Sequence, residues 1–134
     1  MLLPVPADDE LQPANTVPIK KPEAREQARL VAGLRKCWAK LDEYERPLIW
    51  HIPNGGSRNA MEASNLKTQG VLAGIPDLEI AAPGGLTVRI EMKAPKGMVS
   101  LLQAGIHRQM EALGHIIITA YSAEEALVKL RELQ

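Results

Sequence analysis

The stretch GIPDLEIAAPGGLTVRIEMK, residues 74–93, decides the fold. Two runs of alternating residues, 77–81 and 86–93, flank a Pro-Gly-Gly turn, and this pattern predicts a β-hairpin. The apolar residues of the two runs that alternate with charges stand at even-numbered positions, and the charged residues stand at odd-numbered ones. Because side chains alternate between the two faces of a strand, one face of the hairpin is predicted to be apolar and the other charged.

Three charges on the second face stand out. Asp77 opens the first strand, and Glu91 and Lys93 lie two positions apart at the end of the second, so their side chains share a face. Taken singly, each has an ordinary explanation as a solvated surface group or a turn residue, and isolated ion pairs indicate little about function. The combination with Gln103, on the next predicted helix, is more specific.

Two carboxylates that converge on one point, Asp77 and Glu91, form an oxygen-ligand site suited to a hard divalent cation such as Mg²⁺ or Mn²⁺. Such an ion can polarise a phosphoryl oxygen and lower the pKa of a bound water. Lys93 beside that water could orient it, accept its proton or offset developing charge. The group of residues is therefore suited to the hydrolysis of a phosphodiester.

The rest of the chain predicts helices on either side of the hairpin. A proline opens the first helix, Ser100 is the expected N-cap of a later one that stops at Gly114, and Ser122 with Glu125 has the spacing of a capping box. We interpret the order of elements as an α/β or α+β domain with a mixed sheet of about four strands flanked by helices. Outside the hairpin, the expected helices cover 22–44, 60–70, 100–113 and 122–133, and the expected strands cover 47–52 and 115–121.

The composition fits one domain of 134 residues. Sixteen basic residues balance sixteen acidic ones, which argues against strong nonspecific binding of nucleic acid, and an aromatic content of 3% makes a poor stacking platform for bases. The single cysteine, Cys37, and the lack of a long apolar run favour a protein of the cytoplasm with no membrane span. The proline-rich residues 1–21 are expected to form a flexible tail, which leaves 22–134 as the domain.

The sequence also resembles a known family. Pro76-Asp77 followed by Glu91-x-Lys93 is similar to the signature of the PD-(D/E)XK nuclease superfamily. The finer resemblance is to its VRR-NUC (virus-type replication-repair nuclease) domains and covers roughly residues 22–133. The segments that carry it are HIPNGG (51–56), GVLAGIPDLEI (70–80), RIEMKAPKGMVSLLQ (89–103) and LGHIIITAYSAEEALVKL (113–130).

The resemblance implies a restriction-endonuclease-like fold and assigns roles to residues. Asp77 and Glu91 would hold the metal with the main-chain carbonyl of Met92, Lys93 would act on the attacking water, and Gln103 would orient the catalytic groups or the phosphate. Gln103 could equally close a capping box with the serine three positions before it. The family's acidic residue on the first helix, followed four positions later by Gln, matches Glu23 and Gln27; it could be confused with Glu26, or Glu23 could act only on the helix dipole.

The implied activity is a Mg²⁺-dependent DNA endonuclease, similar to a Holliday-junction resolvase, that works as a homodimer on branched or duplex DNA in phage or bacterial repair and recombination. A nuclease-fold domain that binds nucleic acid or a partner without cutting, and a plain interaction domain with solvated charges, are the alternatives. Two further interpretations concern the surroundings of the motif. His51 and His115 are interpreted as strand residues and not as ligands, and Arg58, Lys67, Lys96 and Arg108 are candidate phosphate contacts for which surface solubility is an equal explanation.

Overall fold

The computed structural model describes residues 3–13, 19–53 and 59–134. Four strands and four α-helices follow one another along the chain, with short 3₁₀ turns at Asp8–Glu10 and Pro83–Gly85. The elements, in chain order, are α1 (Pro22–Trp38), β1 (Leu48–His51), α2 (Ala60–Thr68), β2 (Leu78–Ala82), β3 (Leu86–Met92), α3 (Leu101–Ala112), β4 (Ile116–Ala120) and α4 (Ala123–Arg131).

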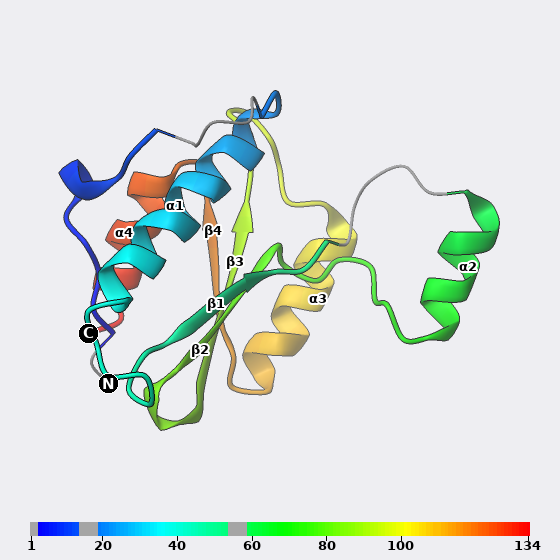
Figure 1. Cartoon of the computed structure of the whole chain (residues 1–134). Coiled ribbons are helices and arrows are strands. Elements are labelled where there is room, and N and C mark those ends of the chain that lie inside the picture. The colour runs from blue at the N-terminus through cyan, green and yellow to red at the C-terminus, as the bar shows by residue number, and fades with distance from the viewer. Residues whose placement is uncertain (1–2, 14–18, 54–58) are drawn as a thin grey trace.

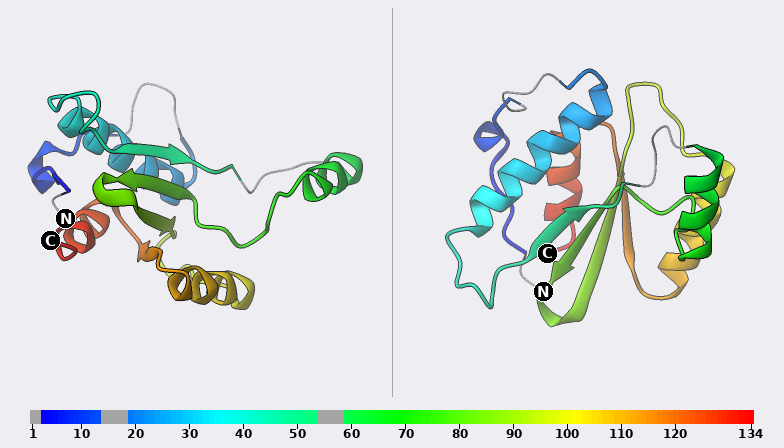
Figure 2. Two further views of the ribbon diagram at one scale, coloured as in Figure 1. Left: turned by 90° about the horizontal axis from the view of Figure 1, so that it is seen from below. Right: turned by 45° about the vertical axis from the view of Figure 1, so that its right-hand side comes forward.

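The strands form one mixed sheet in the order β1-β2-β3-β4. Strand β2 runs antiparallel to both β1 and β3, and β4 runs parallel to β3. A parallel pair needs a crossover connection, and α3 provides it. Helices α1 and α4 cover one face of the sheet and α3 lies on the other (Figure 1, Figure 2). The prediction of an α/β domain with a four-stranded mixed sheet and flanking helices is confirmed.

The even-numbered residues of the hairpin form the centre of the core. Leu78, Ile80, Val88 and Ile90 are completely buried in the layer that also contains buried residues of α1 and α4. Each such side chain contributes roughly 1.5–3 kcal/mol when it leaves water. The alternation read from the sequence therefore identifies the packed face of β2 and β3 correctly.

Helix boundaries follow local capping chemistry. The Ser100 hydroxyl accepts from the main-chain N–H of Gln103, and the Ser122 hydroxyl accepts from that of Glu125. The second capping box differs in detail from the prediction, because the Glu125 carboxylate accepts from the N–H of Tyr121, one residue before the N-cap. Helix α1 ends at Trp38, before Leu41, the last apolar position of its predicted repeat.

Helix α2 stands apart from the rest of the molecule (Figure 1). It has an N-cap, because the Asn59 side chain accepts from the N–H of Glu62 at 2.8 Å, but it contains no buried residue. The glycine-rich segment before it, with Arg58, falls in residues 54–58 and lies outside the described residues. Within the part of the chain that is described, no helix has the length and apolarity to cross a membrane.

The expectation of a flexible tail is wrong for residues 3–13, which pack along α1 and α4. Leu3 is 2% exposed and Leu11 is 8% exposed. The Trp38 indole N–H donates to the carbonyl of Pro4 at 2.8 Å. A Cβ on Gly33 would lie 2.8 Å from a Leu11 methyl, so a larger residue there would require the Leu11 side chain to shift. Prolines suggested a mobile tail, but the leucines between them complete the core. Residues 14–18 of the expected tail lie outside the described residues.

Leu3→Ala should lower the free energy of unfolding by about 2–4 kcal/mol, because it leaves a cavity under a buried side chain. Chemical denaturation measures the change, with Asp9→Ala at an exposed position of the same segment as the control. Equal stabilities of the two variants would show that the segment is detached in solution.

Candidate active site

The residues predicted to act together surround one cleft of about 510 Å³, at the end of the sheet where β3 leads into the loop before α3. Asp77, Glu91 and Lys93 line it from the strands, and Glu23 and Gln27 line it from α1. Gln103 reaches Glu91 and Lys93 from α3 through hydrogen bonds. The fold therefore brings together side chains that are up to 80 positions apart in the sequence (from 23 to 103).

Asp77, immediately before β2, is fixed by residues of two other strands. Its carbonyl oxygen accepts from the N–H of Ile52 and lies 2.8 Å from Nδ1 of His51, which donates to it when protonated at that nitrogen. Its carboxylate oxygen Oδ2 accepts from the N–H of Met92 at 2.9 Å. Sequence analysis missed this role of His51; its place at the head of the HIPNGG segment was the available signal.

Glu91 is only 3% exposed although it carries a carboxylate. Burial, followed by the negative charge of Asp77, raises its pKa to about 8, and the positive charge of Lys93 opposes part of this rise. Its Oε2 atom lies 3.5 Å from Nζ of Lys93 and accepts from Nε2 of Gln103 at 3.3 Å. Its Oε1 atom is buried without a hydrogen-bond partner among the described residues.

Gln103 makes the contacts that both interpretations of the sequence require, and its catalytic role stays a prediction. Its Oε1 atom accepts from the N–H of Ser100 at 3.0 Å, which completes the capping box of α3. The same atom accepts from Nζ of Lys93 at 2.8 Å. The start of α3 and the position of the lysine ammonium group are therefore fixed by one side chain.

The Asp77–Glu91 pair fits a hard divalent cation. A buried carboxylate oxygen without a partner is costly, and the repulsion between the two carboxylates adds to this cost. A cation held between them would satisfy Oε1 of Glu91 and offset the repulsion. Among residues 3–13, 19–53 and 59–134, no three His, Cys, Asp or Glu side chains form a metal-binding group. Two carboxylates with water and substrate phosphate are, however, the usual ligand set of Mg²⁺.

Glu23 and Glu26, the two candidates for the acidic residue on the first helix, have different surroundings in the structure. Glu23 faces the cleft with Gln27, but it does not form a three-carboxylate group with Asp77 and Glu91. Glu26 is bound elsewhere, because its carboxylate contacts the Arg29 guanidinium at 2.9 Å and accepts from the N–H of Ala123 at the start of α4. Glu23 is thus the helix residue placed to act in the cleft, and its role there stays a prediction.

His107 is a second buried polar residue that sequence analysis missed. It lies one helical turn after Gln103, is 6% exposed, and its Nε2 atom is buried without a hydrogen-bond partner among the described residues. Burial lowers the pKa of its imidazole, so the ring is neutral near pH 7. The spacing of four residues from Gln103 on α3 was the signal that could have found it.

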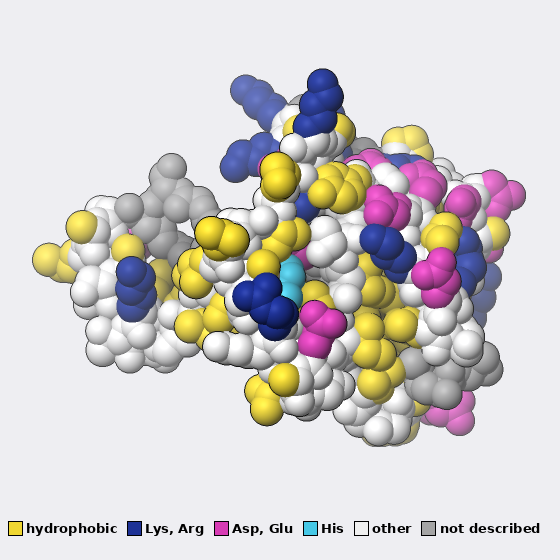
Figure 3. Space-filling model, turned by 180° about the vertical axis from the view of Figure 1, so that it is seen from behind, with side chains coloured by type: hydrophobic (Ala, Val, Ile, Leu, Met, Phe, Trp, Pro, Cys, Tyr) yellow, Lys and Arg dark blue, Asp and Glu magenta, His cyan; other side chains and the backbone are white. Residues whose placement is uncertain are grey.

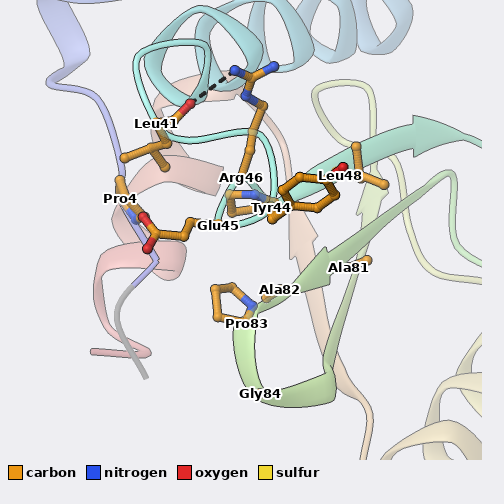
Figure 4. A pocket seen from close by; sticks show the side chains of 11 residues that line it. Pro4, Leu41, Tyr44, Glu45, Arg46, Leu48, Ala81, Ala82, Pro83 and Gly84 are labelled. Atoms are coloured by element: carbon orange, nitrogen blue, oxygen red, sulfur yellow. Dashed lines mark hydrogen bonds between the residues drawn. The ribbon is translucent and has the colours of Figure 1, made fainter.

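A larger hollow, of about 600 Å³, lies at the opposite end of the sheet, beside the β2–β3 turn (Figure 4). Apolar side chains such as those of Leu41, Leu48 and Pro83 line it. Arg46 at its edge donates to the carbonyls of Ala39 and Leu41, so its guanidinium is used in holding the loop. The hollow contains no pair of carboxylates, and the chemistry of the smaller cleft is the better basis for a catalytic site.

Neither a protein-family model nor a curated protein matches the sequence. Solved structures match the fold, two of them named for the VRR_NUC domain. A "VRR_NUC domain protein" aligns with a TM-score of 0.64 and 23% identity over 85% of this chain and 88% of that one. A "VRR_NUC domain" aligns with a TM-score of 0.56 and 18% identity over 84% of this chain and 97% of that one. The chain therefore has the fold of VRR_NUC domains, and the expectation of a restriction-endonuclease-like fold is confirmed.

The raised pKa of Glu91 predicts how stability depends on pH without metal. The unfolded chain releases the Glu91 proton near pH 4.3, whereas the folded chain keeps it up to about pH 8. Between these values the folded state binds the extra proton, so stability falls as the pH rises from about 5 to about 8. Thermal melts in EDTA should show this loss for the wild type and a much smaller one for Glu91→Gln, whose amide does not titrate. Parallel pH profiles of the two proteins would contradict the burial of a titrating Glu91.

Proposed function

We propose that the protein is a Mg²⁺- or Mn²⁺-dependent nuclease that cleaves DNA phosphodiester bonds endonucleolytically. The observation that carries the proposal is the buried Glu91 carboxylate beside Asp77, one oxygen of which meets no hydrogen-bond donor among the described residues. The likeness in fold to VRR_NUC domains and the resemblance of the sequence motifs support the same activity. The proposed substrate is branched or duplex DNA, cut as by a Holliday-junction resolvase in phage or bacterial repair and recombination.

Each residue of the cleft has a part in this reaction. Asp77 and Glu91, with the main-chain carbonyl of Met92, would hold the cation, which when bound would polarise a phosphoryl oxygen and make water more acidic. The hydrogen bonds from Met92 and Gln103 keep the two carboxylates in place before substrate arrives. Preorganised groups of this kind lower the reorganisation needed in the transition state.

Lys93 is proposed to act on the attacking water and on the charge that develops at phosphorus. Its Nζ atom is held by Gln103 at 2.8 Å and lies 3.5 Å from Oε2 of Glu91, while its side chain is 16% exposed. An ammonium group fixed at the edge of a cleft can donate to an incoming phosphate oxygen and orient water for in-line attack. The reaction needs no covalent enzyme intermediate.

Activity should require the cation and Lys93. Cleavage of labelled four-way junctions and linear duplexes is expected in Mg²⁺ or Mn²⁺ and not in EDTA. Lys93→Ala should lower the single-turnover rate by about 10²–10⁴-fold, the usual contribution of a positioned proton-transfer group. Its melting temperature should stay close to that of the wild type, because Lys93 lies outside the apolar core. Lys36→Ala, at an exposed position near the end of α1, is the matched control.

Cleavage in EDTA at the full rate would exclude the metal-dependent mechanism. A Lys93→Ala protein that cuts at the wild-type rate would exclude the role assigned to the lysine. Divalent-ion binding without any cleavage of the panel would instead favour a nuclease fold that binds but does not cut.

We propose further that the protein works as a homodimer, since two symmetric cuts need two sites in fixed opposition. Helix α2, with Met61 75% exposed and no buried residue, supports this proposal and is the surface expected to pair. Light scattering at micromolar concentration should give about 29 kDa, twice the 14.6 kDa of one chain. A mass of one chain, with no preference for junctions over duplex, would exclude the resolvase-like activity and leave the nuclease proposal standing.

A further inference from the structure

The loop between β3 and α3 contains a backbone conformation that its sequence disfavours. Residues 94–97, Ala-Pro-Lys-Gly, form a tight turn in which the N–H of Gly97 donates to the carbonyl of Ala94 at 2.8 Å. Lys96 has φ +66°, and it is the only described residue other than glycine with positive φ. Pro95 fixes the preceding φ near −65°, so the turn is of type II, whose third position favours glycine or asparagine.

The turn does contain a glycine, but not at the left-handed position. A glycine stands at the next position, where a Cβ would come within 2.9 Å of the Ala94 carbonyl oxygen, so the turn uses its glycine for close packing. The left-handed position is occupied by Lys96, which has an unbranched charged side chain. A positive φ is energetically unfavourable for such a residue. Residues held in such conformations occur most often at functional sites.

This turn belongs to the wall of the cleft. Ala94 and Gly97, on either side of the turn, line the same cleft as Asp77 and Glu91, and Lys96 between them is exposed. The Tyr121 hydroxyl, at the end of β4, donates to the Gly97 carbonyl at 2.9 Å and ties the turn to the sheet. Lys96 therefore stands exposed on a turn that is anchored to the sheet beside the cleft, between two residues that line it.

Positive charge gathers at this end of the molecule although the whole chain is neutral. Lys and Arg side chains crowd the upper end in the view from behind, which is the end formed by the start of α1 and the β3–α3 loop (Figure 3, Figure 1). Lys20 and Lys21 are exposed just before α1, and Lys21 lines the cleft. A local cluster of this kind attracts a polyanion when net charge does not.

We propose that Lys96 is a DNA-backbone-binding residue, which binds a phosphate next to the one being cleaved, and that it acts in addition to Lys21, which lines the cleft. The inference rests on the proposed nuclease function and adds to it a binding residue outside the carboxylate–lysine group. The left-handed conformation of Lys96 has a cost in local stability, which the binding role would explain. The contact is made to the phosphodiester backbone and not to a base, so it strengthens binding to DNA of any sequence.

Two substitutions at position 96 remove the positive charge without disturbing the turn. Lys96→Asn and Lys96→Gly both remove the cation and both suit the left-handed position, so neither should lower the melting temperature. Lys96→Arg keeps the charge on the same backbone. Lys36→Ala removes an equal charge from a distant exposed position near the end of α1.

DNA binding is measured with a labelled duplex in Ca²⁺ over a series of KCl concentrations, and single-turnover cleavage at saturating DNA is measured in Mg²⁺. Lys96→Asn and Lys96→Gly should bind roughly 3- to 10-fold more weakly and lower the slope of log K against log [salt] by about 0.9, the loss of one phosphate contact. Lys96→Arg and Lys36→Ala should match the wild type. The effect of Lys96→Asn and Lys96→Gly is expected in DNA binding, and Lys36→Ala should keep the wild-type cleavage rate at saturating DNA.

Suppose that the wild type binds and cuts DNA but Lys96→Asn has the same slope of log K against log [salt] as the wild type. This result would overturn the inference and leave the nuclease proposal intact. A slope change equal to that of Lys36→Ala would do the same, because it would reflect net charge alone. A lower melting temperature in both Lys96→Asn and Lys96→Gly would refute the strained turn on which the inference stands. A wild type with no affinity for DNA would overturn both proposals together.

Discussion

A buried carboxylate beside a second carboxylate is the constraint around which this domain is built. Glu91 lies 3% exposed in the sheet, and the charge of Asp77 adds to the cost of its ionisation. Lys93 and the Gln103 amide offset part of this cost, and both contact only its Oε2 atom. The other oxygen of Glu91 has no hydrogen-bond partner among the described residues, and the pKa of the carboxyl group is raised.

The topology of the sheet determines where the two carboxylates and Gln103 lie. Asp77 is held by β1 and by the N–H of Met92, so the antiparallel part of the sheet positions the first carboxylate. The parallel crossover from β3 through α3 to β4 brings Gln103 back over the end of β3. Because Gln103 also closes the cap of α3, a change that loosens the helix start would move Lys93 as well.

The sequence predicted the part of the fold that depends on local pattern. The parity of residues 77–93 identifies the hairpin, its buried face and the residues that share the other face, because strand geometry alone determines these features. It could not show that Glu91 is buried, since that depends on the pairing of β4 with β3 and on the position of α3, from which Gln103 reaches Glu91. It also failed for residues 3–13, where Leu3 is held by hydrogen bonds to Gln134 and Pro4 by one from Trp38, both of which are distant in sequence.

Direct binding of Mn²⁺ tests the central claim, that Asp77 and Glu91 form a cation site. Electron paramagnetic resonance titration of the wild type should show one bound ion per chain, and both Asp77→Asn and Glu91→Gln should abolish it. Glu79→Gln is the matched control, because Glu79 lies on the same hairpin in an ion pair with Arg89, and its loss should leave binding unchanged. Equal Mn²⁺ binding by the wild type and Glu91→Gln, or none by the wild type, would contradict the account.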